Sequence, residues 1–337
     1  MKKFSKLIAI LSVLALMAVV LAGCGGSGGN SGSDEDQSAA ENPTNLSMST
    51  GSTSGTYYPL GTAIANVLTN SDLGINMTAE ATGGSVENAR FLGQKQSDIG
   101  FVESLVADEA YNGTDMFGGT KIENIRGLIS LYPNTIQVVV KKDSGIQTFS
   151  DLKGKRVACG IQGSSSPLNL QFVLEAYDMS MDDIKPEYLS FGQGMDLLKD
   201  NQLDAVLVDA GAPNSAIIDI STQHEIHILS IEPEKIAQIK EKYPYFSDPV
   251  TIPAGTYKGV DEDVITTGSK VTLCTRAELS EDLIYNILKA IFDNKDKITQ
   301  VHEKGSSIDL EQATDAISIP LHPGAVKYYQ EQGLDVK

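Results

Sequence analysis

The chain has 337 residues, no tryptophan, three cysteines and a formal net charge of −18 at pH 7. This excess of acidic residues argues against nucleic acid as a partner and against electrostatic binding to an anionic membrane surface. The part that follows the N-terminal segments is longer than a single hydrophobic core usually supports, so two lobes are expected.

Residues 1–23 have the pattern of a bacterial lipoprotein signal peptide. A lysine-rich start precedes an apolar run over residues 7–22, which is shorter than the roughly 20 residues of a spanning helix and ends in LAGC. The pattern predicts cleavage before Cys24, lipidation of the Cys24 thiol, and an extracytoplasmic protein anchored to the cell membrane. A plain N-terminal anchor with an incidental cysteine is the alternative. Residues 24–44 are rich in Gly, Ser and acids and predict a flexible tether.

From residue 45 onward, short apolar runs alternate with segments of helical spacing. NLSMST, INMTAEA and SDIGFVES are typical of strands, whereas YYPLGTAIANVLTN and GSVENARFLGQKQ predict helices. This order predicts an α/β fold with mostly parallel sheets and helices on both faces.

A weak internal repeat predicts that the two lobes resemble each other. SGTYYPLGTAI aligns with QGSSSPLNLQF at an offset of about 108 residues, which pairs Gly55 with Gly163. FLGQKQSDIGFVE aligns with DLLKDNQLDAVLVD at an offset of about 106, which pairs Glu103 with Asp209. Each half therefore reads as a strand, a Gly–hydroxyl turn and a helix, followed by a second helix–strand unit.

Three turns rich in Gly and hydroxyl groups lie where predicted strands end and helices begin. Glycine lets the backbone approach a ligand closely, and a helix N-terminus favours an anion. The turns therefore predict a cleft between the lobes, lined by hydroxyl and amide groups. The alternative for each turn is helix capping, the ordinary role of Ser and Thr at this position. The residues concerned are Ser54, Gly55 and Thr56, then Ser85 and Asn88, then Gly163, Ser164, Ser165 and Ser166.

Motifs for catalysis or for a cofactor are not recognised in the sequence. The HEIH stretch at residues 224–227 has two imidazoles but no third metal ligand nearby, and no P-loop occurs. We expect no metal site, no cofactor and no enzyme activity. Cys159 and Cys274 fall in strand-like runs of different predicted lobes, which predicts two buried thiols.

The series STGSTSGTYYPLG, TGGSVENARFLGQKQSDIGFVES, DEAYNGTDMF, GLISLYPNTIQVVVKKDSGIQTFSDLKGKRV, TIPAGTYKG and IPLHPGAVKYYQEQG resembles the TAXI-type solute receptors. These are the extracytoplasmic binding subunits of tripartite ATP-independent periplasmic (TRAP) transporters. The resemblance runs from about residue 46 to residue 333. It implies a two-lobed periplasmic-binding-protein fold of type II, with the ligand at the interlobe cleft and two crossing segments that act as hinges. The crossings would fall near Val138–Gly145 and Thr251–Gly259.

With these crossings, lobe 1 would hold residues 45–140 and 256–337, and lobe 2 residues 141–255. The resemblance also implies a monomeric receptor for a small carboxylate or an amino acid, such as glutamate or glutamine, which delivers its ligand to TRAP membrane subunits. A secreted enzyme using Ser or Glu103 on the same scaffold, or a surface sensor or adhesin, are the alternatives.

The resemblance carries over a set of ligand-binding residues by motif match. They are Ser54, Thr56, Tyr57, Ser85, Asn88, Glu103, Ser104, Ser164, Ser165, Ser166, Gln193 and Asp209. The second-lobe loop reads GSSSP, where such receptors often read Gly-Ser-Gly-Thr. Arg90 and Arg126 are both candidates for pairing with a ligand carboxylate, and the sequence does not choose between them.

Overall fold

The computed structural model describes residues 43–337. The predicted signal peptide, Cys24 and all of the tether before residue 43 lie outside the described residues. Within the described part of the chain, no helix combines the length and the apolar character that crossing a bilayer requires.

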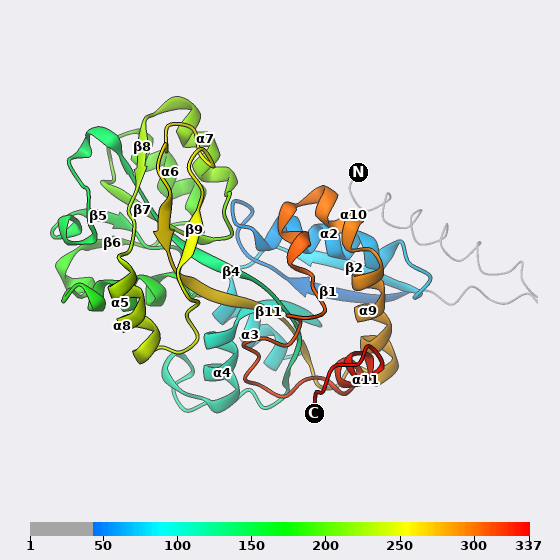
Figure 1. Cartoon of the computed structure of the whole chain (residues 1–337). Coiled ribbons are helices and arrows are strands. Elements are labelled where there is room, and N and C mark those ends of the chain that lie inside the picture. Colours follow the sequence, from blue (N-terminus) through cyan, green and yellow to red (C-terminus); the bar gives the residue numbers. More distant parts are fainter. Residues whose placement is uncertain (1–42) are drawn as a thin grey trace, which may run out of the picture. The chain divides into compact units, whose positions relative to one another are not determined.

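Strands and helices alternate along most of the chain (Figure 1). The strands are β1 (Thr44–Ser49), β2 (Ile75–Glu80), β3 (Ile99–Glu103), β4 (Ile125–Lys141), β5 (Arg156–Ala158), β6 (Lys185–Glu187), β7 (Ala205–Ala210), β8 (Ile226–Ile228), β9 (Val250–Ile252), β10 (Val264–Thr266) and β11 (Gly268–Arg276). The helices are α2 (Tyr57–Thr69), α3 (Ser85–Gly93), α4 (Ser104–Asn112), α5 (Ser166–Ala176), α6 (Phe191–Lys199), α7 (Ser215–Gln223), α8 (Pro233–Lys242), α9 (Glu281–Asp293), α10 (Lys295–Val301) and α11 (Pro323–Glu331).

One mixed sheet connects most of the strands. Its order is β2-β1-β3-β11-β4-β7-β5-β6, with β8 paired to β4. Strands β11 and β4 lie at the centre of this sheet. On the β11 side, β1 runs parallel to β2 and β3; on the β4 side, β5 runs parallel to β6 and β7. Between them, β11 is antiparallel to β3 and β4, and β4 is antiparallel to β7.

The long strand β4 carries the chain from one half of this sheet to the other (Figure 1). Thr135 marks the change of partner, because it is in register with Gly268 of β11 and with Ala210 of β7. The chain returns at residues 266–268. There the Thr266 hydroxyl donates to the Ile136 carbonyl over 2.6 Å, and the Ile136 N–H donates to the Thr267 carbonyl over 2.9 Å.

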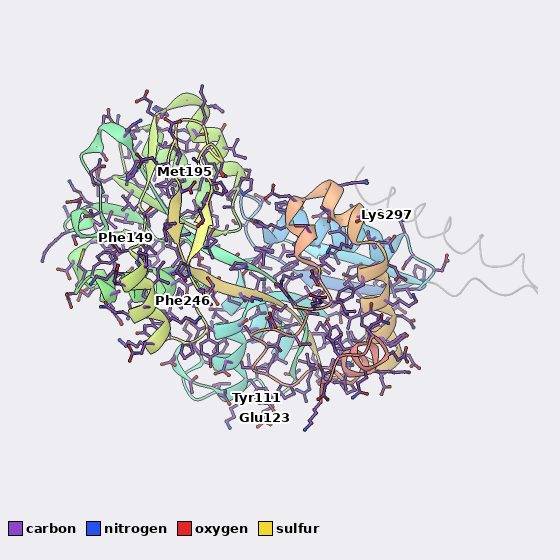
Figure 2. All side chains as sticks on the ribbon, viewed as in Figure 1. Tyr111, Glu123, Phe149, Met195, Phe246 and Lys297 are labelled. Carbon is purple, nitrogen blue, oxygen red and sulfur yellow. The ribbon has the colours of Figure 1, made fainter. Side chains whose placement is uncertain are left out.

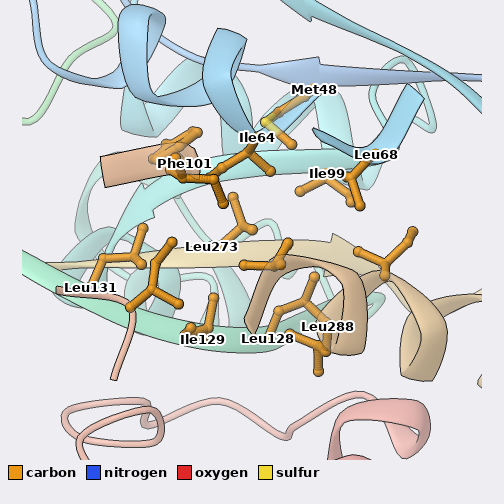
Figure 3. Close-up of a cluster of buried hydrophobic side chains, with 14 of the residues drawn as sticks. Met48, Ile64, Leu68, Ile99, Phe101, Leu128, Ile129, Leu131, Leu273 and Leu288 are labelled. Atoms are coloured by element: carbon orange, nitrogen blue, oxygen red, sulfur yellow. The ribbon is translucent and has the colours of Figure 1, made fainter. Parts of the chain in front are cut away.

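Helices cover both faces of the first half of the sheet. Successive residues of a strand point to opposite faces, so Phe101 of β3 packs with α2 and α9, while Val102 packs with α3 and α4. Figure 3 shows the larger of the two clusters, in which Ile64 of α2 and Leu288 of α9 lie against β3, β4 and β11. The expected α/β layering with helices on both faces is therefore present.

The second half of the sheet repeats this arrangement. Val138 of β4 packs with α5 and α8, and its neighbour Val139 packs with α6 and α7. Figure 2 labels a member of each cluster, Phe149 in the first and Met195 in the second.

We propose to place the boundaries at the two crossings of the central strands. The first lobe then holds residues 43–134 and 268–337, and the second lobe residues 135–267. In this proposal the first crossing lies earlier than the expected segment near 138–145, and the return crossing lies later than the expected segment near 251–259. The return is placed later because β9 and β10 pair antiparallel within the second lobe, and Tyr257, in the connection between them, packs in the second-lobe cluster of Val139.

Equivalent hydrogen bonds mark the internal repeat. Asp98 Oδ2 accepts the Ser47 N–H of β1 over 2.8 Å, and Asp204 Oδ2 accepts the Arg156 N–H of β5 over 2.8 Å. Each aspartate also pairs with an arginine, Asp98 with Arg276 and Asp204 with Arg156. The sequence alignment at an offset of about 106 residues pairs Asp98 with Asp204. The start of β3 and the start of β7 therefore share the same aspartate-to-backbone hydrogen bond.

Candidate functional site

A cavity of about 50 Å³ lies between the two lobes. Its walls come from the turns before α2, α3, α5 and α6 and from the end of β7. Both lobes thus contribute the beginnings of helices, as the Gly–hydroxyl turns of the sequence indicated. The predicted site residues that line this cavity are Gly55, Thr56, Tyr57, Ser85, Ser164, Ser165, Ser166 and Asp209.

The hydroxyl groups at two of these helix starts do not cap their helices. Thr56 and Ser165 occupy the N-cap positions of α2 and α5, but neither side chain accepts a hydrogen bond from the first turn. Ser190, by contrast, accepts the Gln193 N–H and caps α6. Capping therefore accounts for the hydroxyl group at α6 but not for those at α2 and α5. The first turns of α2 and α5 each contain a proline without an N–H group, Pro59 and Pro167, and their other N–H groups remain available to a polar group in the cavity.

Two predicted residues join the lobes beside the cavity without lining it. Ser54 Oγ accepts the Gly192 N–H over 3.2 Å, and the Ser54 carbonyl accepts from Asn214 Nδ2 over 3.1 Å. The Gly163 carbonyl accepts the Glu87 N–H over 3.1 Å. These bonds hold the lobes against each other on two sides of the cavity.

Two buried carboxyl groups, one from each lobe, meet next to the cavity. Glu103 ends β3 and is 0% exposed; Asp209 lies in β7 and is 4% exposed. Asn169 Nδ2 bridges them, donating to Glu103 Oε2 over 2.9 Å and to Asp209 Oδ2 over 2.8 Å. Asn134 Nδ2 donates to Glu103 Oε1 over 2.7 Å. The two acidic positions that the repeat aligned are therefore in the same hydrogen-bond network.

Tyr57 connects this network to the first helix start. Its hydroxyl accepts from Asn134 Nδ2 over 2.8 Å and lies 3.4 Å from the hydroxyl of Ser85. Its ring stacks on Phe101 with 5.1 Å between the ring centroids. The tyrosine is thus fixed on both its apolar and its polar side.

Burial controls the protonation of this cluster. It raises the pKa of Glu103, and burial together with the charge of Glu103 raises the pKa of Asp209 well above its usual range. Burial and then the charge of Glu103 also raise the pKa of Tyr57 and of Tyr132. The cluster is therefore a place where negative charge is costly without a cationic partner.

Neither arginine considered for the ligand lies at the cavity. Arg90 donates to the Met116 carbonyl over 3.2 Å, and Arg126 donates to the Glu123 carbonyl over 2.7 Å. Among the described residues that line the cavity there is no Lys, Arg or His.

Three further predicted residues use their side chains for internal bonds. Asn88 Nδ2 donates to the carbonyls of Thr50 and Phe101, over 2.6 Å and 2.8 Å, and so fixes the turn before α3. Ser104 Oγ donates to the Lys270 carbonyl of β11 over 3.1 Å. Gln193 is exposed and belongs to the capping box of α6. None of the three lines the cavity.

Asn134 and Asn169 are not among the site residues that the sequence analysis predicts. A signal for Asn169 exists, because it lies between two leucines in the first turns of α5 and asparagine is a poor helix former. Asn134 follows a proline in a strand and has no comparable local signal.

The fold agrees with comparisons to solved structures. The alkanesulfonate-binding protein SsuA from Xanthomonas axonopodis pv. citri, bound to MOPS, is 16% identical with a TM-score of 0.51, over 86% of this chain and 84% of that chain. A protein of Bordetella bronchiseptica RB50 is 16% identical with a TM-score of 0.50, over 86% of this chain and 89% of that chain. These similarities confirm the expected two-lobed periplasmic-binding-protein fold of type II. The sequence itself matches the NMT1-like family over residues 48–333, and the chain belongs to that family.

Proposed function

We propose that the protein is an extracytoplasmic solute receptor that captures a small carboxylate or amino acid between its lobes. The observation that carries this proposal is the cavity at which uncapped helix starts from both lobes meet, at Thr56 and at Ser165. Each helix start contributes about 0.3–1 kcal/mol to holding an anion, and charge-assisted hydrogen bonds add about 1.5–3 kcal/mol each. A micromolar dissociation constant corresponds to about 8 kcal/mol, so the contacts of both lobes are needed.

The size of the cavity requires the lobes to move. A cavity of about 150 Å³ in another protein holds benzene, and the space here is about 50 Å³. A solute of amino-acid size therefore enters only when the lobes separate further than in this structure. Bending at residues 134–136, where β4 changes its partner from β11 to β7, and at residues 266–268, which join β10 to β11, would open the cavity.

The resemblance to TAXI-type receptors supports the further proposal that the solute passes to TRAP-type membrane subunits. In this arrangement the lipid on Cys24 holds a monomeric receptor at the membrane, and the predicted tether of residues 24–44 allows it to reach its partner. SsuA from Xanthomonas is described as an alkanesulfonate-binding protein, which is consistent with a receptor role for this fold.

Calorimetric titration of the full-length protein tests the receptor role. The panel holds the common L-amino acids, taurine, and mono- and dicarboxylates, and we expect saturable binding with one site per chain. A ligand at a hundred times its dissociation constant should also raise the free energy of unfolding by about 2.7 kcal/mol. An absence of heat and of thermal stabilisation with every compound would contradict the proposal.

A further inference from the structure

A second groove, with a volume of about 410 Å³, crosses the boundary between the lobes. Helix α4 and the turn after it form its first-lobe wall, and α5 with the segment after α8 forms its second-lobe wall. Leu105 of α4 packs in the same cluster as Phe172 of α5, so the two walls are in contact. The groove shares no lining residue with the interlobe cavity and has no part in the proposed capture of a solute.

The first-lobe wall of this groove is acidic. Asp108 and Glu109 lie in the second half of α4, and Asp115 follows in the next turn. Glu109 is only 4% exposed, and its Oε2 atom is buried without a hydrogen-bond partner. Buried polar atoms in folded proteins nearly always have a partner, so a hydrogen-bond donor is missing from this wall.

Positive charge is missing from the same wall. Among the described residues that line the groove, Lys242 is the one cation, and its Nζ donates to Glu175 over 2.6 Å, outside the groove. Burial, and then the charge of Asp115, raise the pKa of Glu109 to about 7. A negative charge on Glu109 is therefore costly unless a cation reaches it.

The second-lobe wall is aromatic. It carries Phe172 of α5, and Tyr243 and Tyr245 from the segment at the end of α8. Phe172 and Tyr243 stack on each other, whereas Tyr245 lies beside the acidic wall. Burial, and then a hydrogen bond from the Tyr245 hydroxyl to Asp108, raise the pKa of this tyrosine to about 12. An aromatic ring next to carboxyl groups is a suitable surface for a flat organic cation.

We propose that this groove binds a guanidinium group, with Glu109 and Asp108 as acceptors and the ring of Tyr245 as the stacking surface. A guanidinium is planar, always charged and carries five N–H donors, so it supplies both the donor and the charge that the acidic wall lacks. Within the part of the chain that the structure describes, no group of three or more His, Cys, Asp or Glu side chains is placed to hold a metal ion, which favours an organic cation.

The guanidinium group comes either from a free small molecule or from an arginine side chain of a partner protein. In both cases it would contact α4 of the first lobe and Tyr245 of the second. A cation held by both walls therefore favours the arrangement of the lobes seen here over a more open one.

Calorimetric titration of the full-length protein with matched probes tests the inference. Butylguanidine represents the free source and is compared with butylurea; the peptide acetyl-Gly-Arg-Gly-amide represents the protein source and is compared with its citrulline counterpart. We expect a guanidinium probe to bind at one site per chain, and its uncharged partner at least about ten-fold more weakly. Tighter binding of butylguanidine supports the free source, and tighter binding of the peptide supports the protein source. Equal binding of charged and uncharged partners, or no binding of either guanidinium probe, overturns the inference.

A second arm uses Glu109→Gln, which keeps the shape of the side chain and removes its charge. Affinity for the guanidinium probe should fall at least about ten-fold, while the melting temperature should not fall below that of the wild type. Glu123→Gln makes the same change on an exposed residue outside the groove and should alter affinity less than about two-fold. If Glu109→Gln does not fold, Asp108→Asn on the half-buried neighbour replaces it, with the same expected loss. Unchanged affinity in the folded variant overturns the inference.

Discussion

Glu103 and Asp209 are the residues on which the properties of the site depend. Both are fully or almost fully buried, and the same amide of Asn169 donates to both. A buried pair of carboxyl groups without a cation destabilises the folded protein, as functional groups often do. The two carboxyl groups should therefore affect the free energy of unfolding of the protein as well as its affinity for a ligand.

The unfolding free energy should depend on pH through this pair. Their raised pKa values mean that the folded protein binds more protons than the unfolded chain. The stability that the pair contributes is therefore complete below the ordinary carboxyl range of about 4 and is lost as pH rises through the raised values. The other titratable groups that face the pair are Tyr57 and Tyr132.

Urea unfolding without ligand, repeated between about pH 4 and about pH 8, measures this effect against Asp209→Asn. The variant lacks one of the titrating groups, so its free energy of unfolding should increase relative to that of the wild type as the pH rises. The expected difference at the alkaline end is on the order of 1 kcal/mol in favour of the variant. A difference that stays constant with pH would show that Asp209 does not titrate in this range.

Gly160 sets the position of the turn before α5. Its φ angle is +91°, and a Cβ atom there would lie 2.6 Å from the Cβ of Ser166. Gly160→Ala should therefore lower the free energy of unfolding by about 2 kcal/mol or more and move Ser166 out of the cavity wall. Chemical denaturation and titration measure the two effects. Gly154→Ala is the control: its φ angle is also positive, but no atom lies within 4 Å, so it should affect stability alone.

At the scale of elements, the helix starts differ in what their hydroxyl groups do. Ser280 accepts the Leu283 N–H and caps α9, far along the chain from the site, whereas Ser165 at the start of α5 caps nothing. Local sequence does not separate the two cases, because both are serines before a helix. The difference arises from the second lobe's turn being held at the cavity, where Ser165 lies close enough to hydrogen-bond Glu103.

Alanine substitutions at these two serines should give opposite results. Ser280→Ala should lower the free energy of unfolding by about 1 kcal/mol and leave ligand affinity unchanged. Ser165→Ala should weaken binding about two- to ten-fold, the value of one neutral hydrogen bond, with a smaller effect on α5. Denaturation curves of both variants measure the change in the free energy of unfolding, and calorimetric titration measures the change in ligand affinity. A larger loss of affinity in Ser280→Ala than in Ser165→Ala would contradict this reading of the turns.

The elements themselves were largely predictable, because the apolar periodicity and the Gly–hydroxyl turns are local signals. The repeat also predicted equivalent positions for Glu103 and Asp209 near the ends of β3 and β7, and both accept from the same amide of Asn169. The return crossing that we propose differs from the expected one, because TIPAGTYKG reads as a connection between lobes in sequence but supplies the end of β9 and part of its connection to β10. The role of Asn134 was not predictable from local pattern, because its partners come from strands and helices that are distant in the chain.

At the scale of the whole molecule, the lobes touch through a few well-defined contacts. Ser54 of the first lobe and Gly192 of the second are hydrogen-bonded, and a Cβ built at Gly192 would lie 3.6 Å from the Cβ of Ser54. This separation is within the range of disulfide-bonded cysteines, about 3.5–4.5 Å. The two positions therefore offer a way to fix the lobes in the arrangement seen here.

The double variant Ser54→Cys, Gly192→Cys should form a disulfide under oxidising conditions and block solute exchange. Cys159 and Cys274 are buried free thiols, as the sequence predicted, and should not compete. Binding kinetics before and after reduction measure the effect: the oxidised form should neither take up nor release solute on the time scale of the wild type. Each single-cysteine variant serves as the control. Unimpaired exchange in the fully oxidised double variant would show that entry does not require the lobes to part.

The internal repeat gives the close approach of the two halves an intrinsic cost. Equivalent positions near the strand ends of the two halves both carry an acid, so bringing the halves together takes two carboxyl groups out of water and raises their pKa values. In the proposed receptor, a solute that donates hydrogen bonds to these carboxyl groups would offset this cost, and the closed shape would then report occupancy. A membrane partner that recognises only the closed shape would not dock on empty receptors.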